Sequence, residues 1–267
     1  MQQSHSTTVE ASWQLPAFEA TVFSPKQHRH ALVIPVLNEG ERIRTQLARV
    51  RDAAPEVDVV IADGGSTDGS LTAPYPESVG VRALLVKTGP GALGAQLRMA
   101  YAWCLREGYD GVVTMDGNGK DGVEAIAVFL ARLDAGFDYV QGSRYAPGGR
   151  AVNTPLERTL GNRLVHAPLL SLAAGQRFTD TTNGFRAYSR RLLEDPRLAI
   201  FRNVFVRYNL LFHITAQAPR LGLLSCEIGV ERRYPDQGKV PTKITGPGAK
   251  LRLLRETFDA ARGAFLP

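Results

Sequence analysis

Asp110-Gly-Val-Val-Thr-Met-Asp-Gly-Asn-Gly-Lys-Asp121 is the stretch from which the fold of this chain can be predicted. Residues 112–115 have the composition of a short buried strand, and the glycines that follow end it. Asp116 and Asn118 then lie at the carboxyl end of the strand, where open α/β sheets bind ligands. Side chains two positions apart face the same way along a strand. The stretch therefore predicts either a divalent-cation site shared with phosphate groups or a solvated turn, which the same residue types favour.

Strands and helices alternate on both sides of this stretch. Apolar runs of strand length occupy residues 31–36, 57–62, 81–86, 112–115, 139–145 with its exit loop, and 221–230. Helical patterns occupy residues 43–50, 97–105, 123–133, 156–174 and about 203–218, with a short one after residue 186. Such alternation predicts an α/β fold, with a mostly parallel, doubly wound sheet flanked by helices in a single domain.

Both ends of the chain differ from residues 29–235, which carry this pattern. Residues 1–28 are mostly polar and are predicted to form a loosely ordered leader. Residues 236–267 begin with a glycine- and proline-rich loop and continue from residue 250 as a basic segment with apolar side chains at three- and four-residue steps. This segment is predicted to be an amphipathic helix, either at an anionic membrane surface or docked on the α/β domain.

Length and composition restrict the function classes. A chain of 267 residues with 44% hydrophobic content can bury the core of one sizeable domain. A net charge of +6 and a pI near 9.5 favour an anionic partner, such as a nucleotide, a phospholipid surface or a nucleic acid. Cys104 and Cys226 are too few for a disulfide framework, which fits a reducing cytoplasm. No apolar run reaches the roughly 20 residues of a membrane span, so we expect a cytoplasmic protein, peripheral at most.

Five motifs occur in order along the chain. They are Pro35-Val-Leu-Asn-Glu39, Asp63-Gly-Gly-Ser-Thr-Asp-Gly69, Met115-Asp-Gly-Asn118, Gly142-Ser-Arg-Tyr145 and Asn183-Gly-Phe-Arg186. Together they resemble family 2 glycosyltransferases of GT-A fold, over about residues 30–245. The branch that they most resemble is that of the dolichol-phosphate or polyprenyl-phosphate mannosyltransferases and glucosyltransferases. The resemblance implies a nucleotide-sugar donor of GDP-mannose or UDP-glucose type, a polyprenyl-phosphate acceptor, Mg²⁺ or Mn²⁺ as cofactor, and inversion at the anomeric carbon.

The resemblance also implies roles for individual residues. Asp116 and Asn118 would bind the metal, and Asn118 stands where the family has a second carboxylate. Catalytic roles are implied for Asp116, Asp180 and Arg186, with Asp180 as the acceptor-side carboxylate. Donor contacts are implied for Pro35, Asn38, Glu39, Asp63, Gly65, Gly94, Asp116, Gly117, Asn118, Arg144 and Lys243.

The residues taken alone leave structural alternatives open. Asp63 and Asp180 can each cap a loop or a helix, Arg144 and Arg186 can be surface arginines, and Lys243 can be a solvated charge. Near Tyr208, the lipid-phosphate branch has a glutamate at the position of Asn209.

The chemistry of the acceptor separates two forms of the hypothesis. A phosphate monoester is largely dianionic at pH 7 because its second pKa is about 6, so it needs no strong general base. A sugar hydroxyl would need one, and Asp180 is the candidate. A soluble, non-lipid acceptor is therefore the first alternative. Nucleotidyl transfer would call for a glycine-rich basic loop in place of residues 35–39, and a nucleic-acid-binding domain is suggested only by the charge, so we expect no nucleic acid.

Overall fold

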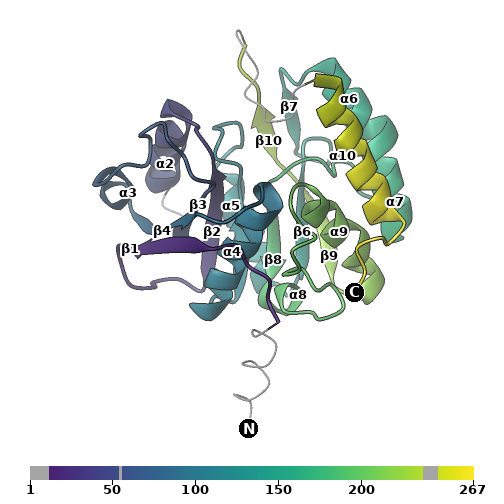
Figure 1. Ribbon diagram of the computed structural model, residues 1–267. Coiled ribbons are helices and arrows are strands. Elements are labelled where there is room, and N and C mark those ends of the chain that lie inside the picture. The colour runs from purple at the N-terminus through teal and green to yellow at the C-terminus, as the bar shows by residue number, and fades with distance from the viewer. Residues whose placement is uncertain (1–11, 54–55, 237–245) are drawn as a thin grey trace.

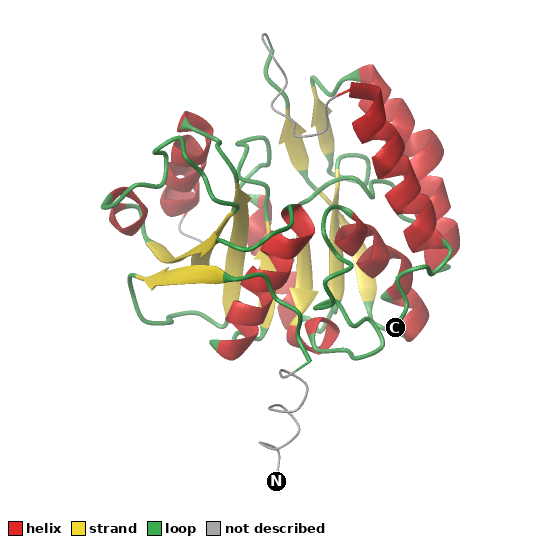
Figure 2. Ribbon diagram, viewed as in Figure 1, coloured by secondary structure: helices red, strands yellow, loops and turns green. Residues whose placement is uncertain are grey.

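The computed structural model describes residues 12–53, 56–236 and 246–267. Its centre is an eight-stranded sheet of order β1-β4-β3-β2-β5-β8-β6-β9 (Figures 1 and 2). The strands are β1 (Phe18–Val22), β2 (His30–Val36), β3 (Asp58–Asp63), β4 (Val81–Lys87), β5 (Gly111–Thr114), β6 (Tyr139–Ser143), β8 (Arg186–Ser189) and β9 (Ser225–Gly229). A separate pair, β7 (Arg150–Val152) and β10 (Glu231–Arg233), is parallel.

Helices cover both faces of the sheet. They are α2 (Glu41–Ala53), α3 (Tyr75–Ser78), α4 (Leu93–Arg106), α5 (Ala125–Asp134), α6 (Leu156–Gly161), α7 (Ala167–Ala174), α8 (Arg190–Leu193), α9 (Asn209–Gln217) and α10 (Gly246–Ala261). A π-helical turn, η1 (Asn162–His166), joins α6 to α7, and a 3₁₀ turn, η2 (Pro219–Leu221), follows α9. None of the helices in the described ranges has both the length and the hydropathy that a membrane span requires.

The core follows from the alternation of side chains along the strands. In β2, Ala31 and Val33 pack with α4 and α9 on one face, while Leu32 and Ile34 pack with α2 and α5 on the other. All four are fully buried, as expected for a central strand covered on both sides. The strand pairs β2–β3, β3–β4, β2–β5 and β6–β9 are parallel, which confirms the predicted mostly parallel α/β fold.

The prediction of a loosely ordered leader is wrong for residues 12–28. Strand β1 pairs antiparallel with β4 at the edge of the sheet, and the ring of Trp13 lies 4.2 Å from that of Phe201, centroid to centroid. The strand was missed because four of its five residues are exposed and its backbone pairing leaves no apolar pattern in the sequence.

Strand β8 is not predicted by the sequence pattern, which indicates only a short helix after residue 186. It lies between β5 and β6 and pairs antiparallel with both. Among the described residues, β8 therefore connects these two strands within one sheet. The consequence for function is that the motif at residues 183–186 enters the sheet beside β5, next to Asp116.

Candidate active site

A pocket of about 790 Å³ opens at the carboxyl ends of β2, β3 and β5. One wall comes from these strand ends and from the start of α4, and the other from α6, η1, α9 and α10. The volume falls within the roughly 300–1,000 Å³ of small-molecule sites, and the position is the one that parallel α/β sheets use for ligands. Asp116, with Gly117 and Asn118, lies on the wall that the strand ends form.

The strand-end half of the pocket is held in shape by Gln96 of α4. Its amide nitrogen donates to the backbone carbonyls of Val36, at 2.7 Å, and of Ala62. This ties the exits of β2 and β3 together at the point where Gly64 lines the pocket, and a side chain at Gly64 would lie 3.3 Å from the Gln96 amide. Pro35 and Glu39 line the same half, and Glu39 accepts from Arg42 at 2.8 Å.

Asn38 and Asp63 are linked through Ser66 and Thr67, in the loop that follows β3. Asp63 accepts from the backbone nitrogen of Ser66 at 3.0 Å, and the Ser66 hydroxyl oxygen accepts from the backbone nitrogen of Asn38 at 2.9 Å. The side chain of Asn38 accepts from Thr67 at 2.8 Å. Gly65 in this loop has a φ of +93°, a conformation that favours glycine. These contacts fit the loop-cap alternative, and the predicted contacts with a nucleoside stay a prediction.

Gly94 and Gly117 allow close backbone approaches. A side chain on Gly94 would lie 2.7 Å from the carbonyl oxygens of Phe205 and Arg207, and its nitrogen already donates to Val206. Gly94 therefore packs α4 against the 205–207 loop, and its backbone amide is not available for the predicted donor contact. Gly117 lines the pocket, where a side chain would lie 2.9 Å from the Pro35 carbonyl. Lys243 lies outside the described residues.

Asp116 is at the centre of a charged cluster. Its Oδ2 accepts from Arg232 at 2.8 Å and from the Asn118 amide nitrogen at 3.4 Å. Its Oδ1 lies where a side chain on Gly184 would come within 2.5 Å, so only glycine at position 184 leaves room for this carboxylate. Although burial acts in the opposite direction, the charges of Arg232 and Lys120 lower the pKa of Asp116. Asp116 is therefore ionised and paired with Arg232.

Arg232 of β10 was not identified from the sequence. Its guanidinium reaches Asp116 through Nη2 and the fully buried Asp121 through Nη1, at 2.6 Å. In the sequence, Glu231-Arg-Arg233 looks like an exposed charged run, yet the middle residue is buried. The signal that could have found it is the pair of carboxylates at the exit of β5, because buried carboxylates require a cationic partner.

Lys120 is the second cation of the cluster. Its ammonium lies 4.8 Å from the centre of the Tyr234 ring, and it lines the pocket. Burial, with a smaller contribution from Arg232, lowers the pKa of Lys120 to about 7. Arg232, together with the partly protonated Lys120, offsets part of the charge of Asp116 and Asp121, so the cluster attracts a free metal ion weakly.

The residues at this cluster fit a divalent cation that a ligand helps to hold. Asp116 can supply one carboxylate and Asn118 one amide oxygen, which in this structure accepts from the backbone nitrogen of Lys120 at 3.3 Å. The described part of the chain contains no group of three His, Cys, Asp or Glu side chains arranged to hold a metal. Mg²⁺ commonly binds through one or two carboxylates and completes its shell with phosphate oxygens and water. Asp116 and Asn118 are therefore sufficient to hold a divalent cation only when phosphate oxygens and water complete its coordination.

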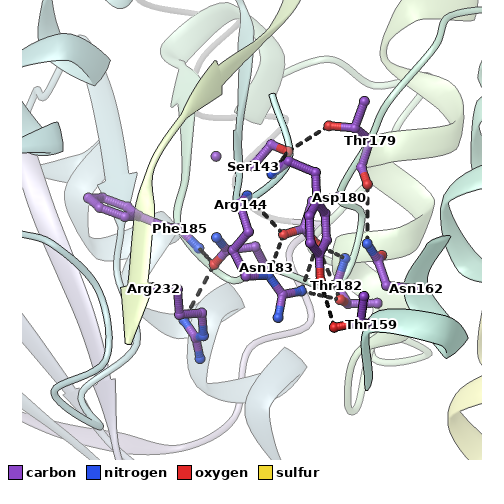
Figure 3. Close-up of polar contacts among 12 residues, drawn as sticks. Ser143, Arg144, Thr159, Asn162, Thr179, Asp180, Thr182, Asn183, Phe185 and Arg232 are labelled. Carbon is purple, nitrogen blue, oxygen red and sulfur yellow. Dashed lines mark hydrogen bonds and ion pairs between the residues drawn. The ribbon is translucent and has the colours of Figure 1, made fainter. Parts of the chain in front are cut away.

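Arg144 and Asp180 form a buried bidentate ion pair (Figure 3). Nε of Arg144 lies 2.6 Å from Oδ2 of Asp180, and Nη2 lies 2.9 Å from Oδ1. Glu227 fixes the loop by accepting from the backbone nitrogens of Thr179 and Asp180. Asp180 is fully buried and is not part of the pocket wall, so the predicted catalytic role at the acceptor side is not supported. Arg144 reaches the wall, with its guanidinium held by Asp180 and Thr182.

Arg186 is a structural residue in this arrangement. Its guanidinium is fully buried and donates to the carbonyls of Thr181, Asn183 and Leu211 and to the hydroxyl of Thr215. These bonds join β8 to α9. Arg186 borders the pocket, but its guanidinium donors bind these protein groups, so the structure gives Arg186 a structural role and its predicted catalytic role stays a prediction.

Comparison with known proteins identifies the family of this chain. The model of the family "Glycosyl transferase family 2" matches residues 31–196. The chain belongs to this family. The polyprenol monophosphomannose synthase of Mycolicibacterium smegmatis is 35% identical over 172 residues, which cover 62% of this chain and 63% of that protein. The undecaprenyl-phosphate mannosyltransferase of Micrococcus luteus is 33% identical over 205 residues, 74% of this chain and 81% of that protein.

Solved structures confirm the GT-A fold of this family 2 member. The glucosyl-3-phosphoglycerate synthase of Mycobacterium tuberculosis, crystallised with Mn²⁺ and UDP-glucose, superposes with a TM-score of 0.59 at 20% identity, covering 90% of this chain and 80% of that one. The family resemblance predicted from the five motifs is thus confirmed, and the two relatives carry the names of its polyprenyl-phosphate branch.

Proposed function

We propose that this chain transfers a hexose from a nucleotide sugar to a polyprenyl phosphate, with Mg²⁺ or Mn²⁺ bound at Asp116 and Asn118. The observation that carries the proposal is the pocket itself, which has a strand-end half that carries Asp116 and a helical half formed by α6, η1, α9 and α10. Ten basic and four acidic side chains line it among the described residues. A pocket with this excess of positive charge suits two phosphate-bearing substrates.

The chain's own residues can stabilise the departing nucleoside diphosphate. Arg232 and Lys120 line the pocket beside Asp116, where cations would face negative charge that develops on the leaving phosphate. A divalent cation, when bound, would neutralise part of the same charge. Gly117 brings the exit of β5 close to that of β2, so that Asp116 and Pro35 line one continuous surface for the donor.

The carboxylates in the pocket favour a phosphate acceptor over a hydroxyl. Among the described lining residues, each acidic side chain already accepts from a partner: Glu39 from Arg42, Asp116 from Arg232, Glu157 from Lys250, and Glu256 from the backbone nitrogen of Tyr208. Asp180 is held by Arg144. A hydroxyl acceptor needs a general base, whereas a phosphate monoester is already a nucleophile at neutral pH. Arg158, Arg207 and Arg252 line the helical half, where an acceptor phosphate would bind.

A thermal-shift screen of UDP-, GDP- and dTDP-sugars, with and without Mn²⁺, tests the donor half of the proposal. A ligand at 100 times its Kd stabilises the folded state by about 2.7 kcal/mol, which raises the Tm by several degrees for a chain of this size. We expect one nucleotide family to do so, and more strongly with Mn²⁺ present. If no nucleotide sugar shifts the Tm, the donor assignment is wrong.

Replacing Asn118 with aspartate is expected to strengthen Mn²⁺ binding to the nucleotide-free protein by about tenfold. The change adds a carboxylate beside Asp116, at a site whose own charge is offset by Arg232 and Lys120. Calorimetric titration of the protein with Mn²⁺, before and after addition of the nucleoside diphosphate, measures both affinities. An unchanged Mn²⁺ affinity in both titrations would show that residue 118 does not contact the metal.

A further inference from the structure

A row of exposed leucines runs along the continuous helical segment α6–η1–α7. Leu156, Leu160, Leu164 and Leu172 recur at steps of four or eight residues, and all are exposed. Single exposed leucines are common on protein surfaces, but rows of them are not. The opposite face of the segment packs against the rest of the protein, where Leu170 and Ala174 are buried. The exposed row therefore has no partner among the described residues.

Helix α10 carries a second row. Leu251, Leu254 and Phe258 are exposed, while Thr257 and Ala260 face the protein. Of the fifteen large hydrophobic side chains that are exposed in the described residues, eight lie on α10 or on α6–η1–α7. The exposed apolar surface is thus concentrated on two elements, both of them remote from β1 at the other edge of the sheet (Figure 1).

The two elements lie side by side and run parallel. Lys250 pairs with Glu157 at 2.6 Å near their first turns, and His166 bonds the hydroxyl of Thr257 at 2.8 Å further along. A small apolar cluster, which includes Leu170 and Ala260, packs them together with α9. Figures 1 and 2 show them as neighbouring helices at one edge of the molecule. We call residues 156–174 and 246–261 the helix-pair surface.

The helix-pair surface is continuous with the pocket. Glu157, Gly161 and His166 line the pocket from one element, and Leu253 and Glu256 line it from the other. One side of the two helical elements therefore forms part of the pocket wall, and the exposed apolar rows lie elsewhere on their surface. A lipid acceptor with its phosphate in the helical half would pass along this wall.

Basic side chains accompany the apolar rows. Arg163, Arg252, Arg255 and Arg262 are exposed on the same two elements or directly after α10, and Lys250 pairs with the exposed Glu157. Asp259 is the acidic neighbour of Arg255 and Arg262. Apolar side chains flanked by arginines suit a bilayer that contains anionic lipids, because the apolar groups enter the acyl boundary and the basic groups meet phosphates.

We propose that the helix-pair surface docks on an anionic lipid bilayer and so places the pocket at the level of the lipid phosphates. The inference rests on the proposed function in one respect, since a polyprenyl phosphate resides in a membrane. It extends the prediction for the C-terminal segment, because α6–η1–α7 supplies more of the exposed apolar side chains than α10 does.

Vesicle flotation of the full-length protein tests this docking. The variant carries Leu156→Gln, Leu164→Gln, Leu172→Gln and Leu251→Gln, which replace side chains that are 71%, 69%, 83% and 68% exposed and therefore contribute little to the fold. The control carries Val22→Gln in β1, Val128→Gln in α5 and Leu224→Gln directly before β9, all of which replace exposed side chains outside the helix-pair surface. We expect wild type and control to float with protein-free vesicles of phosphatidylglycerol and phosphatidylcholine, and less with pure phosphatidylcholine. The variant should need at least about tenfold more lipid for half-binding.

Transfer assays with two acceptors test the docking proposal separately from the proposed function. With a water-soluble short-chain polyprenyl phosphate, variant and wild type should react at equal rates, whereas with a long-chain acceptor in anionic vesicles the variant should be about tenfold slower. If the wild type binds no protein-free vesicle, or binds only vesicles that carry a membrane protein, the lipid-docking surface is wrong, even where the short-chain acceptor reacts. If the protein floats but transfers to neither acceptor, the surface stands and the proposed function fails.

Discussion

Replacing Asp116 with asparagine is expected to lower kcat/KM for hexosyl transfer by about 10³-fold while the fold is kept. The substitution removes the one carboxylate that faces the pocket at the exit of β5, and with it the charge that would hold the cation. Arg232 keeps Asp121 as its partner, so its buried guanidinium is not left without a carboxylate. Initial rates at saturating Mn²⁺ and circular dichroism of the same sample measure both parts of this expectation.

A matched control lies at the other end of the same strand. Asp110 precedes β5 and forms an exposed pair with Arg29, a type of contact that contributes at most about 1 kcal/mol. Asp110→Asn should therefore leave both the rate and the stability near those of the wild type. If Asp116→Asn is also within a few-fold of the wild-type rate, the metal and leaving-group assignment to this residue must be abandoned.

The second large effect concerns stability. Asp180→Ala is expected to lower the free energy of unfolding by about 3–5 kcal/mol, because it leaves the guanidinium of Arg144 buried without its carboxylate. The double variant Arg144→Met with Asp180→Leu should recover a large part of the loss, since apolar side chains can replace a buried ion pair. Urea unfolding, followed by circular dichroism, measures the free energy of unfolding of the wild type, the single variant and the double variant.

The exposed pair Arg51–Asp52 supplies the control for this prediction. Asp52→Ala removes a solvated contact and should cost less than about 1 kcal/mol. An Asp180→Ala protein that is as stable as the wild type but catalytically dead would restore the role of acceptor-side base that the sequence suggested and would overturn the structural assignment.

The sheet and the position of Asp116 could be predicted because they depend on local patterns. Apolar runs of strand length, each ended by glycine or by polar residues, place strands β2 to β5 and put Asp116 at a strand end. Strand β1 could not be predicted in this way, because an exposed edge strand is fixed by the backbone of β4 and leaves no apolar pattern.

The partners of the charged residues could not be predicted, because they come together only in the folded chain. Arg144 and Asp180 were both expected to face substrates, yet they lie 36 positions apart and bind each other. Arg232 is 116 positions from Asp116 and looks like an ordinary surface arginine in the sequence. Local composition identifies which residues are charged, whereas only the tertiary structure decides which of these charges remain available to a ligand.

The most direct test of the proposed reaction is a transfer assay with the purified chain, Mn²⁺, the nucleotide sugar selected by thermal shift, and a polyprenyl phosphate in detergent. Mass spectrometry of the lipid fraction should detect a hexose added to the polyprenyl phosphate, in an amount that matches the nucleoside diphosphate released. If no glycosylated lipid forms with any of the nucleotide sugars, while a soluble phosphorylated or hydroxyl acceptor takes up the hexose, the lipid-acceptor account is contradicted.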